Sequence, residues 1–154
     1  MLLAIEGACG QSLSVEQGEQ WFARNKAALQ SLNNLLLNAP LIRRVEPELP
    51  NDIIPQYGTF DSNTMSAYEN IKTICGEIGV KNIAIARRGS EPNGELIGIR
   101  YILRSYGILV SGGGFLSIQY TPKDSFVKYL YDTENTVRPL EIDGWYVVVY
   151  EDKS

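Results

Sequence analysis

Two pairs of acidic residues near the C-terminal end are the first candidates for chemistry in this sequence. Asp132 and Glu134 form one pair, and Glu141 and Asp143 form the other. Paired carboxylates can act as a general acid and base, or can hold a hard cation such as Ca²⁺ or Mg²⁺. Neither pair has the spacing of a recognised cation-binding loop. We therefore expect these four acids to face solvent or a basic partner rather than to form a catalytic or metal site.

Four arginines are the second candidates. Arg87, Arg88, Arg100 and Arg104 fall in two segments that we expect to be neighbouring strands. A cluster of guanidinium groups can hold a carboxylate or a phosphate by bidentate hydrogen bonds. The alternative, which we favour, places these arginines on the wet face of the sheet, where they pair with nearby glutamates. Arg100 and Arg104 are retained as candidate contacts for a binding partner.

The sequence contains no histidine and only two cysteines, Cys9 and Cys75. The absence of histidine excludes Ser-His-Asp and Cys-His catalysis and every metal site with a histidine ligand. Two cysteines cannot form a four-cysteine zinc site within one chain. Cys75 lies on the apolar stripe of an expected helix, which indicates a buried and unreactive thiol. We predict that the protein is not an enzyme and needs neither a metal nor another cofactor.

The charge of the chain limits the classes of molecule that it is expected to bind. The formal net charge is −4 at pH 7, which disfavours nonspecific binding to nucleic acid or to an anionic membrane surface. Acidic residues are concentrated between positions 132 and 152, where Arg138 is the one basic residue. This asymmetry favours a basic protein as the partner and no nucleic acid.

The N-terminal segment leaves two interpretations open. Residues 1–5 form an apolar run that is too short to span a membrane. The sequence around Cys9, GACGQS, resembles the end of a bacterial lipoprotein signal, in which small residues precede a cysteine that becomes lipidated. That resemblance implies an envelope protein anchored through Cys9. The other interpretation, which we favour, is a cytoplasmic protein in which residues 1–12 are flexible.

The clearest predicted helix covers residues 12–39. Ser14 and Gln17 stand three residues apart, as in a capping box, and Pro40 prevents the helix from continuing. Apolar residues recur every three or four positions between these ends, which indicates one face packed on a core.

Two further helices are predicted. One starts at Asp61 or Ser62, where either side chain can cap it, and ends near Gly79. The other is a short helix over residues 121–130, with a proline in its first turn.

Residues 95–120 are expected to form the centre of a sheet, because this stretch has the densest run of β-branched, aromatic and aliphatic residues. Ile97, Ile99, Tyr101 and Leu103 alternate with other residues, which predicts that the odd-numbered side chains face the core. Three consecutive glycines, Gly112 to Gly114, predict that this stretch folds back on itself and so supplies two strands. The remaining predicted strands cover residues 41–46, 82–88 and 145–150. The whole pattern predicts a single α+β domain over residues 1–154, with a mainly antiparallel sheet of about five strands, two longer helices and one short helix.

Taken together, these features predict a noncatalytic binding protein of bacterial type. Its partner is expected to be another protein, as for an acidic inhibitor or immunity-like protein that neutralises a basic protein. The candidate contacts are Arg100, Arg104, Asp132, Glu134, Glu141 and Asp143. One alternative is a small envelope lipoprotein modified at Cys9, and another is an enzyme that uses carboxylates or arginines.

Overall fold

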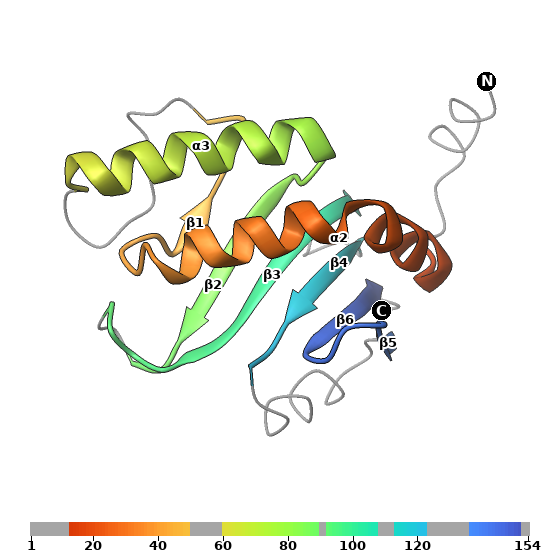
Figure 1. The fold of residues 1–154 in the computed structure, drawn as a ribbon. Helices are drawn as coiled ribbons and strands as arrows, with labels where there is room; N and C mark the ends of the chain where they lie inside the picture. Colours follow the sequence, from red (N-terminus) through yellow and green to blue (C-terminus); the bar gives the residue numbers. More distant parts are fainter. Residues whose placement is uncertain (1–12, 50–59, 90–91, 108–112, 123–135, 152–154) are drawn as a thin grey trace.

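The structure is a computed structural model that describes residues 13–49, 60–89, 92–107, 113–122 and 136–151 (Figure 1). Within these ranges the chain forms two helices and six strands. In chain order the elements are α2 (Val15–Leu37), β1 (Arg44–Val45), α3 (Ser62–Ile78), β2 (Asn82–Arg87), β3 (Leu96–Gly107), β4 (Gly113–Tyr120), β5 (Thr136–Pro139) and β6 (Trp145–Glu151).

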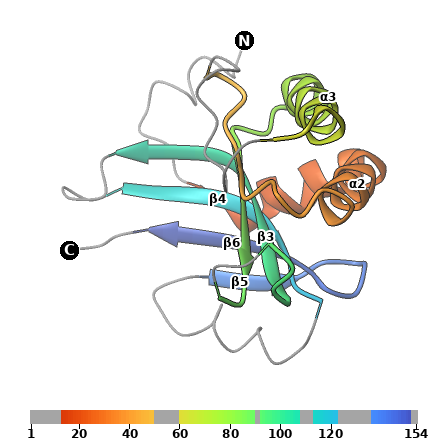
Figure 2. The same ribbon diagram turned by 90° about the vertical axis from the view of Figure 1, so that its left-hand side faces the viewer.

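The six strands form one sheet in which every neighbouring pair is antiparallel. Their order across the sheet is β1-β2-β3-β4-β6-β5, so β1 and β5 are the outer strands. Both helices pack on the same face of this sheet, as the side view in Figure 2 shows. The predicted α+β class, with a mainly antiparallel sheet and two longer helices, is confirmed.

The predicted number of strands was wrong by one. The missed strand is β5, whose four residues are mostly exposed. The residues that precede it in the sequence are polar, as is typical of a loop. An outer strand has only one neighbour, so it needs no strong apolar alternation. The short helix expected over residues 121–130 lies almost wholly outside the described residues, and so does the segment 1–12. The described ranges contain the two longer helices alone.

The ends of both helices follow the predicted capping chemistry. Ser14 Oγ accepts a hydrogen bond from the backbone N–H of Gln17 at 3.2 Å, and Gln17 Oε1 accepts one from the backbone N–H of Ser14 at 3.2 Å. Asp61 Oδ1 accepts a hydrogen bond from the N–H of Thr64 at 2.7 Å and caps α3. Gly79 ends α3 with a φ of 88°, a conformation that glycine adopts without steric cost.

The core lies between the helices and the sheet. Ile99, Tyr101 and Leu103 are buried there, which confirms the predicted dry face for these three residues of β3. The hydroxyl of Tyr101 donates a hydrogen bond to Oδ1 of Asn33 on α2 at 2.5 Å. Both side chains are buried, so this bond satisfies polar groups that would otherwise destabilise the core.

A bulge in β3 changes which face of the sheet its side chains occupy. Arg100 lies opposite Gln119 of β4, but the register shifts between Ile102 and Arg104, and Arg104 lies opposite Leu116. Directly paired residues share a face, and Leu116 is buried in the core beneath the helices. Arg104 therefore lies on the helix-covered face and Arg100 on the other. The expectation that both arginines lie on one wet face was wrong, because the bulge interrupts the two-residue period.

Gly18 sets the distance between α2 and the sheet. A Cβ atom built on this residue would lie 2.4 Å from Cγ2 of Val147 on β6 and 3.1 Å from Cδ1 of Leu116 on β4. A side chain fits at this position only if these neighbours shift, so the first turns of α2 pack closely on the side chains of β4 and β6. This close approach fixes the position of the neighbouring residues of α2 over β3 and β4.

Candidate functional site

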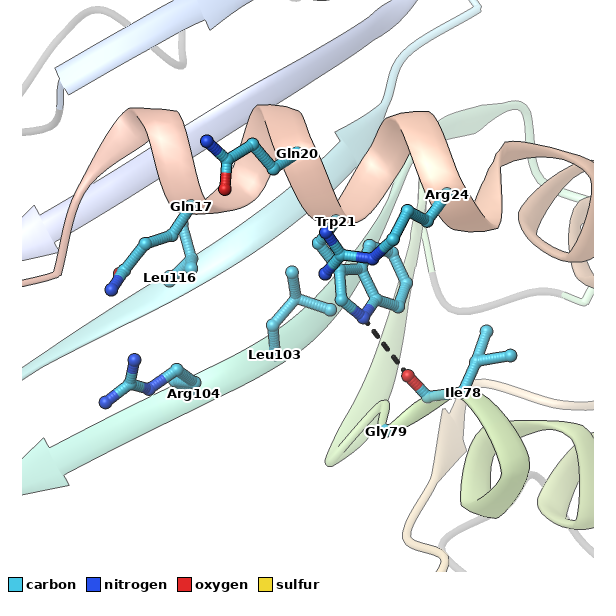
Figure 3. A pocket seen from close by; sticks show the side chains of 9 residues that line it. All are labelled: Gln17, Gln20, Trp21, Arg24, Ile78, Gly79, Leu103, Arg104 and Leu116. Carbon is cyan, nitrogen blue, oxygen red and sulfur yellow. Dashed lines mark hydrogen bonds between the residues drawn. The ribbon is translucent and has the colours of Figure 1, made fainter. Parts of the chain in front are cut away.

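A pocket of about 310 Å³ lies where the N-terminal half of α2 meets the end of α3 and the strands β3 and β4 (Figure 3). Its walls come from both helices, and its floor comes from the sheet. The lining residues are Gln17, Gln20, Trp21, Arg24, Ile78, Gly79, Leu103, Arg104 and Leu116.

Helical spacing explains why α2 presents four of these side chains together. Gln17, Gln20, Trp21 and Arg24 occupy positions i, i+3, i+4 and i+7, which lie on one face of an α-helix. This face borders the buried stripe of α2 and is turned toward β3. The helix thus contributes two carboxamides, one indole and one guanidinium to the same wall.

The acids of α2 are turned away from the pocket. Nη1 of Arg138 on β5 lies 3.5 Å from Oε2 of Glu16 and 3.2 Å from Oε1 of Glu19. These ion pairs hold both carboxylates toward the far edge of the sheet, where β5 lies. The first turns of α2 therefore carry their negative charge on one side and line the pocket with uncharged or positive groups on the other.

Trp21 joins the two helices at the pocket. Its indole N–H donates a hydrogen bond to the backbone carbonyl of Ile78, at 3.1 Å, in the last turn of α3 (Figure 3). The carbonyls at the end of a helix have no partner within that helix, so this bond satisfies one of them. The same contact fixes the indole as a rigid wall of the pocket.

The bulge in β3 brings Arg104 to this site. Leu103 and Leu116 form the apolar floor, and the half-buried side chain of Arg104 extends beside them on the helix-covered face (Figure 3). Without the additional residue in β3, the side chain at this position would point to the opposite face of the sheet. The pocket therefore depends on a backbone irregularity as well as on residue type.

The described lining of the pocket carries basic groups within an acidic protein. Arg24 and Arg104 belong to it, and none of the nine lining residues that the structure describes is acidic. The chain as a whole has a formal net charge of −4. Guanidinium groups present several N–H donors in a planar fork that matches a carboxylate or a phosphate, and carboxamides add further donors. Among the described lining residues, none has a hydroxyl, thiol, imidazole or carboxylate that could act as a nucleophile or a general base.

Comparison with known proteins does not assign this site. The chain matches no protein-family model, and no curated protein or solved structure is significantly similar to it. The function of the pocket has to be argued from its own residues.

Of the predicted binding residues that the structure describes, Arg104 alone lines this pocket. Arg100 lies on the opposite face of the sheet, where its guanidinium carbon is 5.3 Å from the ring centre of Phe115. Phe115 in turn stacks on Tyr150 with ring centres 5.4 Å apart. Arg88 pairs with Glu95, with Nε and Oε1 3.2 Å apart, as expected for an arginine on a wet surface. The four arginines considered in the sequence therefore do not form one cluster.

The two predicted acidic contacts that the structure describes lie elsewhere. Glu141 and Asp143 are exposed in the connection between β5 and β6, and Glu141 forms an ion pair with Lys26 of α2 at 3.2 Å. The other two, Asp132 and Glu134, lie outside the described residues, as does Cys9. Among the described residues, no group of three or more His, Cys, Asp or Glu side chains could hold a metal ion.

Cys75 belongs to a second, smaller pocket of about 290 Å³ beside α3, which is also lined by Lys72 and Lys81. The thiol is fully buried and free, and burial raises its pKa to about 12. This confirms the prediction of a buried thiol and indicates that it is unreactive, because the nucleophilic thiolate is not populated near neutral pH. In the described residues, no helix is long and apolar enough to cross a membrane.

The residues that the sequence analysis missed are those of α2. Neither Trp21 nor Arg24 was singled out there as a candidate binding residue. Their spacing with Gln17 and Gln20 is visible in the sequence. That spacing gives a face of the helix but does not show that β3 supplies an opposing arginine.

Proposed function

We propose that this chain is a noncatalytic binding protein whose partner is another protein, and that its pocket receives an acidic group of that partner. One observation supports the proposal: Arg24 on α2 and Arg104 on β3 line the same pocket, although the chain is acidic overall. Complementary charge at a defined site favours one orientation of a partner over others.

In the structure, the acidic residues give less support to a basic partner than they did in the sequence analysis. Glu141 is paired with Lys26. On α2, Glu16 and Glu19 are both paired with Arg138. These contacts reduce the negative potential that would attract a basic surface. A basic partner bound near Asp143 is the alternative that the experiment below must separate from the acidic one.

The two arginines are expected to contribute unequally. Arg104 is half-buried and Arg24 is exposed. Hydrogen bonds to a charged group in a partly buried site contribute about 1.5–3 kcal/mol, whereas an exposed ion pair contributes about 0.2–1 kcal/mol. Replacing Arg104 should therefore weaken binding by about tenfold or more, and replacing Arg24 by about fivefold at most.

Fluorescence anisotropy with short labelled peptides tests the proposal. Three peptides of equal length carry glutamate, glutamine or lysine at the same positions and leucine between them. The full-length protein is titrated into each peptide at low salt, where exposed charges are least screened. We expect binding of the glutamate peptide, and about tenfold weaker binding to the Arg104→Gln variant.

Arg100→Gln is the matched control, because it removes the same charge from the same strand on the opposite face of the sheet. Equal losses in Arg100→Gln and Arg104→Gln would mean that only overall charge matters, which overturns the assignment of the pocket. Binding of the lysine peptide alone would favour the basic partner. Binding of none of the three peptides would overturn the proposed function.

A further inference from the structure

β5 is weakly held at one border of the sheet (Figure 1). Three of its four residues, Thr136–Pro139, are exposed and the fourth is half-buried. The strand pairs with β6 on one side, and Pro139 has no backbone N–H to give to that pairing. Segments with few buried apolar side chains open locally at a lower free energy than the whole protein unfolds. β5 can therefore leave the sheet while the rest of the fold persists.

β6, by contrast, belongs to the core of the protein. Val147, Val148 and Val149 are each at most 5% exposed. All seven residues of β6 pair with β4, whereas β5 pairs with four of them, from Tyr146 to Val149. When β5 opens, it leaves a firmly held strand whose backbone groups lack partners on that side. Such an edge accepts a strand of another chain.

The ion pairs of β5 indicate what kind of strand fits this edge. Arg138 lies opposite Val147, so its side chain is on the helix-covered face of the sheet. There its Nη1 lies 3.5 Å from Oε2 of Glu16 and 3.2 Å from Oε1 of Glu19. Gly18 lies between these two acids in the sequence and packs against Val147, which brings both carboxylates over the border of the sheet. Two carboxylates at one guanidinium leave a net negative charge, which favours a basic side chain at this position.

From these features we propose that β5 covers a docking edge, and that an extended protein segment with a basic side chain replaces it on β6. The backbone of the segment adds a strand to the sheet. Its basic residue takes the place of Arg138 between Glu16 and Glu19, and an apolar residue beside it takes the place of Val137, which lies opposite the buried Val148.

The length of β6 explains how a separate segment can compete with β5. A tethered strand has the advantage of a high effective concentration. A segment that pairs with more than four residues of β6 gains backbone hydrogen bonds that β5 does not make. This inference does not rest on the proposed function, because the pocket is lined by β3 and β4 and the edge belongs to β6.

Hydrogen exchange of the full-length protein tests the opening of β5. After correction for intrinsic rates, the amides of β5 that point toward β6 should exchange at least about tenfold faster than the amides of β4. High salt should increase this difference, because it screens exposed ion pairs. Arg138→Gln should speed the exchange of β5 about fivefold. Lys26→Gln is the matched control, since it removes the exposed ion pair with Glu141 and should leave the exchange of β5 unchanged. Equal protection of β5 and β4 would overturn the proposal.

Fluorescence anisotropy with labelled peptides of eight residues tests the docking. One peptide carries an arginine among valine, threonine and serine, and a second has glutamate in place of the arginine. A third is the arginine peptide with methyl groups on the alternate amide nitrogens that would face β6, so that these amides cannot donate hydrogen bonds. Each is titrated into the wild type and into a Val137→Cys, Val148→Cys variant in a Cys9→Ser background. These two residues lie opposite one another, so their disulfide holds β5 on β6 and a reductant releases it.

We expect the wild type to bind the arginine peptide about tenfold more tightly than the glutamate peptide, and not to bind the methylated one. The reduced variant should bind like the wild type, and the oxidised variant should not bind. Equal binding by the oxidised and reduced forms would overturn the replacement of β5. Equal binding of the arginine and glutamate peptides would overturn the assigned basic side chain. Binding of no peptide by either the wild type or Arg138→Gln would overturn the docking edge, and would leave the pocket and its acidic ligand untouched.

Discussion

Replacing Gly18 by alanine should destabilise this protein, although alanine is the better helix former. Within a helix, glycine is less favourable than alanine by about 1 kcal/mol, so propensity alone predicts a gain of that size. The structure predicts the opposite sign, because the new Cβ would lie 2.4 Å from Cγ2 of Val147. Valine is branched at Cβ and has few alternative rotamers, so it cannot easily move away.

The expected magnitude follows from these two opposing effects. Overpacking a well-packed core by one methyl group costs about 1–3 kcal/mol. Subtracting the gain of about 1 kcal/mol in helix propensity leaves a net loss of up to about 2 kcal/mol. Gly76 of α3 provides the matched control, since a Cβ atom built there meets nothing within 4 Å. Gly76→Ala should therefore stabilise the protein by up to about 1 kcal/mol.

Urea denaturation, monitored by circular dichroism, measures the change in the free energy of unfolding for both variants, provided that this free energy falls with urea concentration at the same slope in all of them. A third protein, Val147→Ala, tests the cause. In this background Gly18→Ala should no longer destabilise, because the methyl group it meets is gone, which gives a coupling of about 0.5–3 kcal/mol. If Gly18→Ala and Gly76→Ala stabilise the protein equally, the close approach of α2 to the sheet is refuted.

Three further predictions concern other contacts. Tyr101→Phe should destabilise the protein by about 1–3 kcal/mol in urea denaturation, because it leaves Oδ1 of Asn33 buried without its donor; a change below about 0.5 kcal/mol would show that this bond contributes little. Hydrogen bonds from Thr64 lower the pKa of Asp61 below the ordinary value for an aspartate, so the stability that this carboxylate adds is present above that ordinary value and is lost as the pH falls through the folded pKa. Asp61→Asn keeps an acceptor without the charge, so below about pH 5 its stability should fall less steeply than that of the wild type, and parallel curves would contradict the assignment. With burial raising its pKa to about 12, the thiol of Cys75 in a Cys9→Ser background should react with a disulfide reagent only after unfolding, and fast labelling of the native protein at pH 8 would disprove this.

Local chemistry explains which elements could be predicted from the sequence. The ends of α2 and α3 depend on Ser14, Asp61 and Gly79, whose effects act within one turn of helix. The centre of the sheet was predicted because β3 and β4 are buried and rich in strand-forming residues. By contrast, β5 is held by its pairing with β6, and its own residues give little sign of a strand.

The candidate site could not be predicted in the same way, since it joins residues about eighty positions apart. Arg24 and Arg104 meet the same pocket only because Gly18 lets α2 approach the sheet and because the bulge turns β3. Each of these features is a property of the packed chain. The two-residue period gave the correct face for Tyr101, before the bulge, and the wrong face for Arg104, after it.

The outer strands of the sheet affect how copies of this protein behave toward one another. On one side β1 has two residues, and on the other β5 has four, of which Pro139 has no backbone N–H to donate. Such borders offer few backbone groups for a strand of a second molecule to join. Within the part of the chain that the structure describes, pairing of a second molecule with β1 or β5 is therefore disfavoured, and self-association at high concentration should proceed through side-chain surfaces instead.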